Sequence, residues 1–134
     1  MIGSSGRNGA FSQFERSEIS FEEFCAKFER ECEQHGHKVD SSRFVAAIEE
    51  ETAKEVPEMI AALKKLRERG IKICAVTNNW FSKMDVDSQK RFEELCRLFD
   101  DVLESRVLRM NKPDPRLYKL ACERMRVPFE ETAF

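Results

Sequence analysis

The chain has 134 residues, the size of one ordinary domain with room for a small appendage. Its 23 basic and 25 acidic residues give a formal net charge of -2, a balance that argues against nucleic-acid binders and binders of anionic membranes. Hydrophobic residues make up 41% of the chain, enough for a core, and no apolar run approaches the roughly 20 residues of a membrane span.

The N-terminal part of the chain predicts a small all-helical unit rich in phenylalanine. Residues 1–10 are rich in small polar residues and are expected to be flexible. Ser20 and Glu23 have the spacing of a capping box, and apolar residues at helical spacing follow, which predicts a helix over 21–34. A second cap at Asp40 and another apolar stripe predict a helix that runs to about residue 54.

The rest of the chain alternates between helix and strand signals. Pro57 suits the first turn of a helix, and Gly70 suits its left-handed cap. The near-continuous apolar run 71–76 predicts a central parallel strand. A helix beginning at Asp87 and a weaker strand over 101–105 follow.

A last helix is predicted over 115–126, with Asp114 as its cap. Helix, glycine and buried strand in succession indicate an α/β fold: a partial Rossmann-like parallel sheet flanked by helices, with an all-helical cap at the N-terminus. The shift in composition near Pro57 predicts a division into a cap, 1–56, and a partial α/β core, 57–134.

The five cysteines are odd in number and form no C-x-x-C pair, so we expect free thiols in a reducing compartment. The cytoplasm is the first expectation, with organelle targeting left open. His35 and His37 have no cysteine at ligand spacing, which argues against a zinc site.

Two polar segments carry the candidate chemistry. Thr77 falls at the carboxyl end of the first predicted strand, where its hydroxyl and the amide of Asn78 can face an anion. Lys112 is mounted on a stiff loop before Pro-Asp-Pro, a good position for a charge aimed at phosphate. Each segment alone also fits a polar turn or a solvated surface lysine. Together they predict that Thr77 and Lys112 converge on one anion-sized spot at the open rim of the sheet.

Val-Thr-Asn-Asn at 76–79 and Lys-Pro-Asp-Pro-Arg-Leu-Tyr at 112–118 resemble the second and third motifs of haloacid dehalogenase-like hydrolases. The chain is especially similar to the phosphatase-like domain at the N-terminus of soluble epoxide hydrolases and to the similar domain fused to an acyl-CoA dehydrogenase. Residues 14–24 resemble the start of that group's helical cap. The resemblance covers the chain from about Gly9 to Phe134.

The resemblance implies magnesium-dependent hydrolysis of a small phosphorylated substrate. In the family an aspartate at the end of the first strand forms an aspartyl-phosphate, and a second aspartate two residues on is the general acid and base. Thr77 and Asn78 match the groups that bind the phosphoryl oxygens, and Lys112 matches the lysine that neutralises charge there. Magnesium is held by the nucleophile and by acidic residues after a later strand.

The chain departs from this pattern at the nucleophile and the metal ligands. Its first aspartate is Asp40, so no Asp-x-Asp precedes the cap. Asp85 and Asp87 have that spacing but lie in a predicted loop, and the pair at 100–101 precedes a strand. The family's metal-binding pair normally follows a segment like 131–134, where this sequence stops. We therefore expect a fragment, truncated at both ends, that neither binds magnesium nor turns over phosphate esters by itself.

Four further residues are candidates for a substrate pocket: Asn79, Trp80, Phe81 and Arg16. Trp80 and Phe81 fit packing between core and cap equally well, and Arg16 fits a solvated helix face. The alternative function is a non-catalytic interaction or regulatory module, or an isoform. Exposed edges of a small sheet also favour self-association.

Overall fold

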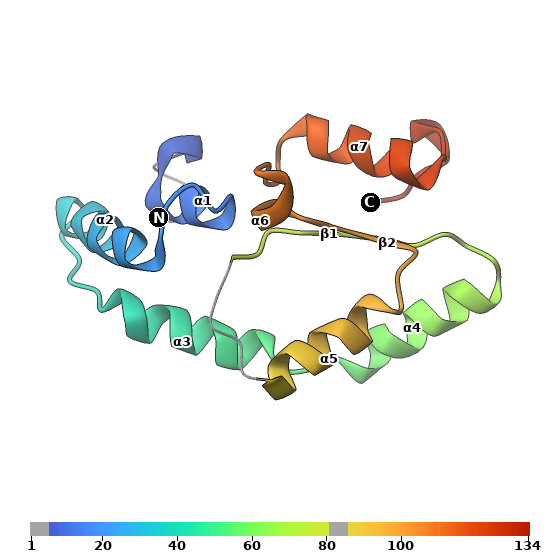
Figure 1. The fold of residues 1–134 in the computed structure, drawn as a ribbon, viewed down its shortest axis with the longest axis horizontal. Coiled ribbons are helices and arrows are strands. Elements are labelled where there is room, and N and C mark those ends of the chain that lie inside the picture. The colour runs from blue at the N-terminus through green and yellow to red at the C-terminus, as the bar shows by residue number, and fades with distance from the viewer. Residues whose placement is uncertain (1–5, 81–85) are drawn as a thin grey trace.

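The computed structural model describes residues 6–80 and 86–134. Figure 1 shows a parallel strand pair at the centre, with α7 on one side and α4 and α5 on the other. Helices α1, α2 and α3 lie toward one end of this strand pair. In chain order the elements are η1 (Gly6–Asn8), α1 (Ala10–Glu15), α2 (Phe21–Gln34), α3 (Ser41–Thr52), α4 (Pro57–Glu68), β1 (Cys74–Thr77), α5 (Val86–Cys96), β2 (Asp101–Glu104), α6 (Ser105–Leu108), α7 (Pro115–Met125) and η2 (Phe129–Glu131).

The caps predicted for the N-terminal helices are confirmed. At the start of α2, Ser20 Oγ accepts from Glu23 N (3.1 Å), and the Glu23 carboxylate accepts from Ser20 N (2.8 Å). The Asp40 carboxylate accepts from Arg43 N (3.0 Å) at the start of α3. Each side chain satisfies backbone groups that have no partner within the helix, so both helices begin where the sequence predicts.

The N-terminal helices bury one apolar cluster. Phe24 is fully buried on α2, and its ring stacks on Phe14 of α1 with 4.6 Å between centroids. Trp80, just beyond β1, lies 6.0 Å from the Phe14 ring and thereby joins the end of the sheet to the helices. We call this group the phenylalanine cluster; its rings belong to Phe11, Phe14, Phe24, Phe28, Phe44 and Trp80.

The α/β fold class is confirmed. Strands β1 and β2 pair in parallel, in a register that runs from Cys74 opposite Asp101 to Thr77 opposite Glu104. Leu103 on β2 and Leu117 on α7 are fully buried. Because the strands end at the same level, the residues that follow Thr77 and Glu104 meet at one edge of the sheet.

The first strand is shorter than the predicted run 71–76 and begins later. Gly70 has a φ of +72°, and Ile71 N still donates to the carbonyl of Leu66 (3.1 Å), so the chain is closing α4 at this point. All four residues of β1 are half-buried, whereas the apolar run predicted a fully buried central strand. Within the described residues β1 has β2 as its one partner, which leaves its other edge unpaired.

Helices α1 and α6 were not predicted. Residues 1–10 are expected to be flexible, yet η1 forms at Gly6–Asn8 and Ala10 is fully buried. The Ala10 backbone N–H donates to the Glu31 carboxylate of α2 (3.0 Å), and Arg7 pairs with Asp114 of the α7 cap. These partners are distant in sequence, so no local signal marks them.

All five cysteines are free; Cys32 is buried and the other four are half-buried. Burial raises the pKa of the Cys74 thiol to about 11, which keeps it protonated and unreactive at neutral pH.

Across 6–80 and 86–134, no helix combines the length and the apolarity that a membrane crossing needs.

Candidate anion-binding site

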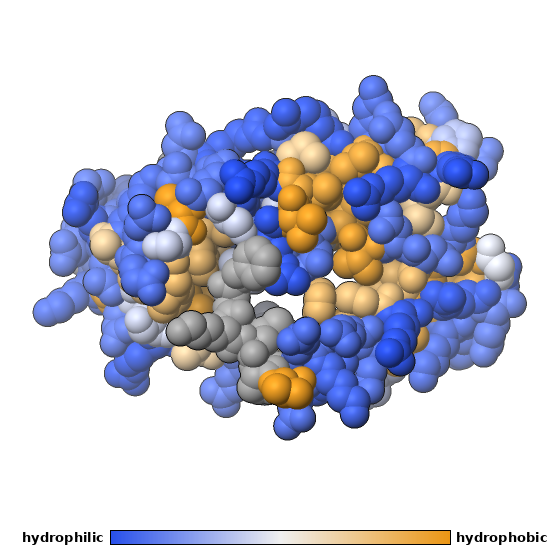
Figure 2. Space-filling view, viewed as in Figure 1, coloured by the Kyte–Doolittle hydropathy of each residue, from blue (hydrophilic) through white to orange (hydrophobic). Residues whose placement is uncertain are grey.

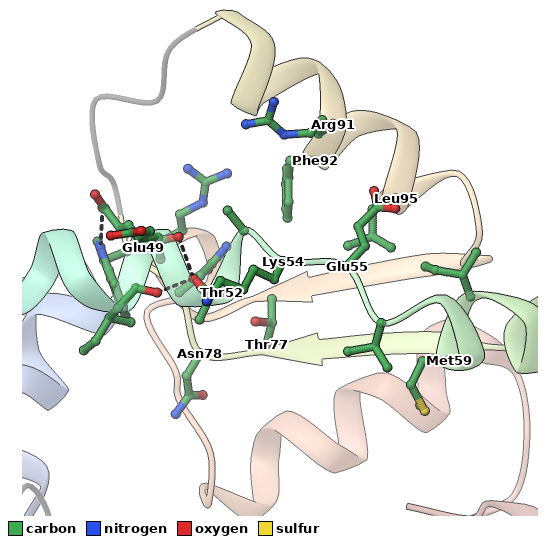
Figure 3. A pocket seen from close by; sticks show the side chains of 18 of the residues that line it. Glu49, Thr52, Lys54, Glu55, Met59, Thr77, Asn78, Arg91, Phe92 and Leu95 are labelled. Atoms are coloured by element: carbon green, nitrogen blue, oxygen red, sulfur yellow. Dashed lines mark hydrogen bonds between the residues drawn. The ribbon is translucent and has the colours of Figure 1, made fainter.

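Thr77, at the carboxyl end of β1, opens onto a groove of about 940 Å³. The groove runs between the sheet end and helices α3, α4 and α5, and its apolar walls include Met59, Phe92 and Leu95. Figure 3 shows the Thr77 side chain on the side of β1 that faces α5, and Figure 2 shows hydrophobic residues along one side of the hollow. The Thr77 hydroxyl makes no hydrogen bond to a described residue, so it can donate to a ligand.

Asn78 joins the end of β1 to the loop of the predicted lysine. Its Oδ1 accepts from the Lys112 backbone N–H (2.8 Å), and its Nδ2 donates to the Lys112 carbonyl (3.2 Å). We call this pair of hydrogen bonds the Asn78 clamp. It connects residues 34 positions apart and brings the two predicted motifs together at one edge of the sheet.

Thr77 and Asn78 project to opposite sides of the chain (Figure 3). Successive side chains of an extended strand alternate in this way. The groove is lined by Thr77 and Asn78 but not by Lys112, which is half-buried beside Asn78. The two loops are therefore adjacent: the Thr77 hydroxyl faces the groove, and the Lys112 backbone lies beside the Asn78 side chain. Convergence of the Thr77 and Lys112 side chains on one anion stays a prediction.

Glu15, the last residue of α1, reaches the same place. Its Oε2 accepts from Asn111 Nδ2 (2.8 Å) and from Asn78 Nδ2 (3.3 Å). Burial raises the pKa of the Glu15 carboxyl above its ordinary value, although these amides and the charges of Arg16 and Lys112 partly oppose the rise. Sequence reasoning missed Glu15, because a single glutamate beside an arginine carries no signal for a partner more than sixty residues away.

Ser105 holds the backbone of this region and was also missed. The residue is fully buried directly after β2. Its Oγ accepts from Asn79 N (3.0 Å) and lies 2.7 Å from the Glu15 carbonyl oxygen. One hydroxyl therefore connects the ends of both strands to the end of α1.

Arg16 is buried and does not line the groove. Its guanidinium makes a bidentate pair with Glu18 (2.7 Å each) and donates to Ser12 Oγ, Asn111 Oδ1 and the Arg7 carbonyl. These bonds occupy all of its N–H donors. The contact with substrate that the sequence suggests for Arg16 is thus replaced by a structural role.

Trp80 makes the predicted packing contact between core and cap, and its contact with substrate stays a prediction. It lines the groove, and it packs edge-on against Phe11 with 5.6 Å between centroids. Asn79 also lines the groove; its Nδ2 donates to Glu104 (2.6 Å), while its Oδ1 is buried without a partner among the described residues. Phe81 and Asp85 lie outside the described residues.

The described residues do not fit the magnesium ion that the family resemblance implies. The carboxylates nearest the sheet end, Glu15 and Glu104, each accept hydrogen bonds from side-chain donors rather than facing a common point. In residues 6–80 and 86–134, no group of His, Cys, Asp or Glu side chains is arranged to hold a metal. Asp101 begins β2, as predicted, and its carboxylate pairs with Arg124 (3.4 Å).

Comparisons with known proteins agree with this architecture. A model of the haloacid dehalogenase-like hydrolase family matches residues 6–134. Acyl-CoA dehydrogenase family member 10 of Mus musculus is 31% identical over 96% of this chain and 12% of its own length. Bifunctional epoxide hydrolase 2 of Sus scrofa is 28% identical over 96% of this chain and 25% of its own length.

A solved structure has the same fold. It is a haloacid dehalogenase family enzyme from Bacteroides thetaiotaomicron, an aspartate-to-alanine mutant in complex with magnesium and inorganic phosphate. It aligns with a TM-score of 0.53 and 20% identity, over 90% of this chain and 62% of that one. The chain spans an eighth to a quarter of the length of the two curated relatives. On the family match, the chain belongs to the haloacid dehalogenase-like hydrolases.

Proposed function

We propose that this chain carries the phosphate-binding elements of a haloacid dehalogenase-like hydrolase of the phosphatase type. The phosphate of a small ester sits beyond the carboxyl end of β1. The Thr77 hydroxyl and the Asn78 amide bind its oxygens from the strand end, and the Lys112 ammonium neutralises its charge from the neighbouring loop.

The observation that supports this proposal most is the Asn78 clamp. Two hydrogen bonds hold the backbone of Lys112 against the end of β1. A lysine whose backbone is held in this way loses less conformational freedom on binding an anion than a lysine on an unsupported loop. The half-buried surroundings also strengthen its attraction for an anion relative to the same pair in bulk water.

We further propose that the chain does not hydrolyse phosphate esters by itself. Its residues supply no Asp-x-Asp after an apolar strand, and removing a covalent nucleophile typically costs several orders of magnitude in rate. Magnesium, when bound in this family, supplies charge neutralisation at the phosphoryl group. The described carboxylates offer it no common site.

Two measurements test the proposal. Inorganic phosphate titrated into the chain and followed by NMR is expected to bind, and Lys112→Ala is expected to weaken binding about tenfold, or ~1.4 kcal/mol. A generic aryl phosphate with magnesium is expected to show no turnover above that of the Lys112→Ala variant. Robust turnover that disappears in this variant would contradict the lack of competence and support the site. Equal phosphate binding by both proteins would contradict the site itself.

We also propose a division of the chain into two parts and self-association through the sheet edge. The division into a cap, 1–56, and a core, 57–134, is supported by two observations: all rings of the phenylalanine cluster except Trp80 belong to residues 1–56, and Leu103 and Leu117 are buried in the second part. Self-association through the unpaired edge of β1 is tested by sedimentation. A reducing, cytoplasmic location, and the alternative of a non-catalytic module, stay predictions.

A further inference from the structure

Glu15 places a carboxylate among the groups that the proposed function assigns to phosphate. Asn78 and Asn111 donate to the same oxygen, at 3.3 and 2.8 Å. The charge of Lys112 acts on this carboxylate, and so does that of Arg16. The Glu15 backbone is fixed by its contact with buried Ser105, so the side chain starts from a defined position.

A carboxylate and a phosphate bind the same kinds of hydrogen-bond donors and cations. Both accept hydrogen bonds from amide N–H groups and from ammonium groups, and both bind these donors more strongly in a setting that is partly shielded from water. The donors on Asn78 and Asn111 are neutral, and the positive charges that act on Glu15 are those of Arg16 and Lys112. Since all five donors of Arg16 are occupied by other groups, Lys112 is the cation that is able to exchange one anion for another.

We propose that Glu15 is an internal anion that occupies the phosphate position beside Asn78 and Lys112 and competes with phosphate for it. This inference rests on the proposed function. Phosphate binding then requires the Glu15 side chain to leave Asn78. Helix α1 thereby makes the anion affinity of the site depend on the position of the cap.

A purely structural role for Glu15 gives the opposite expectation. If the carboxylate only ties α1 to the loop at Asn111, its removal loosens that loop and weakens phosphate binding. If the carboxylate competes, its removal leaves Lys112 without an anion and tightens phosphate binding. The sign of the change in affinity therefore separates the two roles.

The test is a titration of the whole chain with inorganic phosphate, in the wild type, Glu15→Gln, Lys112→Ala and the double variant. Glu15→Gln keeps the size of the side chain and removes its charge. Glu22→Gln, on the exposed face of α2, is the matched control for the change in net charge. We expect Glu15→Gln to tighten phosphate binding about fivefold or more and Glu22→Gln to change it less than about twofold.

The outcomes distinguish the inference from the proposed function. Unchanged or weaker binding by Glu15→Gln, with binding still dependent on Lys112, overturns the internal anion and leaves the site standing. If Lys112→Ala leaves phosphate binding unchanged in both the wild type and Glu15→Gln, the inference and the proposed function are both overturned. Should Glu15→Gln not fold, two tests remain. Glu15→Asp, one methylene shorter, is expected to tighten binding as well. In the wild type, phosphate is expected to shift the side-chain amide signals of Asn78 and Asn111; unshifted signals at saturation overturn the inference.

Discussion

Asn78→Ala tests whether the Asn78 clamp holds the Lys112 loop in solution. The change deletes three hydrogen bonds, two to the Lys112 backbone and one to Glu15. A hydrogen bond contributes a net ~0.5–1.5 kcal/mol, and an unsatisfied backbone N–H in a half-buried position adds to the loss. We therefore expect the free energy of unfolding to fall by about 2–3 kcal/mol.

Urea denaturation followed by circular dichroism measures this loss. At roughly 4 °C per kcal/mol for a chain of this size, the same change lowers Tm by about 8–12 °C. Asn8→Ala is the control, since Asn8 is exposed and only its backbone carbonyl accepts a hydrogen bond, from Lys27. An Asn78→Ala midpoint that coincides with that of Asn8→Ala would refute the clamp and remove the main support for a fixed Lys112.

Asn78→Asp separates the two halves of the clamp. The aspartate keeps an acceptor for the Lys112 N–H but replaces the amide donor with a second carboxylate beside Glu15. Like charges at this separation repel, so we expect Asn78→Asp to be at least as unstable as Asn78→Ala at neutral pH and to recover part of the loss in acid. A stability that does not depend on pH relative to the alanine variant would argue against the Glu15 contact.

Three further changes have defined outcomes. Ser105→Ala leaves buried backbone groups without a partner, so we expect the free energy of unfolding to fall by ~1–3 kcal/mol in urea denaturation. Ser42→Ala, exposed on α3, is the control, and equal midpoints for the two variants would contradict the Ser105 contacts. Phe24→Ala empties the centre of the phenylalanine cluster and is expected to cost about 3–5 kcal/mol, so a loss under ~1 kcal/mol would argue against its burial. Hydrogen bonds from Arg16 lower the pKa of Glu18, so the stability that Glu18 contributes is present above the ordinary value of 4.5 and is lost as pH falls through the lowered pKa. The stability difference between the wild type and Glu18→Gln is therefore expected to shrink in acid, and a constant difference would contradict the pairing.

The helices predicted from the sequence are those whose capping residues lie next to them in the chain. Ser20 and Glu23 cap α2, Asp40 caps α3 and Asp114 caps α7, and each is within a few residues of the group it satisfies. Local hydrogen bonds of this kind are visible in a sequence because their spacing is fixed by helix geometry. The α/β class followed from the order of these helices and the apolar run after Gly70.

The site was predicted only in part, because its contacts are long-range. The motifs around Thr77 and Lys112 were found, and their adjacency was expected from the topology of parallel strands. The Asn78 clamp, the Glu15 carboxylate and the Ser105 hydroxyl were not found, since each depends on how α1 approaches the sheet. Arg16 was misjudged for the same reason: its exposure depends on whether Asn111 and Glu18 surround it.

The two faces of α1 have different physical roles, and this difference bears on the site. One face packs Phe14 into the phenylalanine cluster, a contact that is apolar and therefore weakly directional. The other face places Ser12 and Glu15 against the side chain of Asn111, which is 4% exposed and bonded to both. Hydrogen bonds fix distance and angle, so this face sets where the Glu15 carboxylate lies relative to Lys112. Changes in the cluster are therefore expected to alter the stability of the chain and leave the phosphate affinity of the folded molecules unchanged, whereas Asn111→Ala alters both. A Phe24→Leu variant with wild-type phosphate affinity beside an Asn111→Ala variant with altered affinity would support this separation; equal effects on affinity would contradict it.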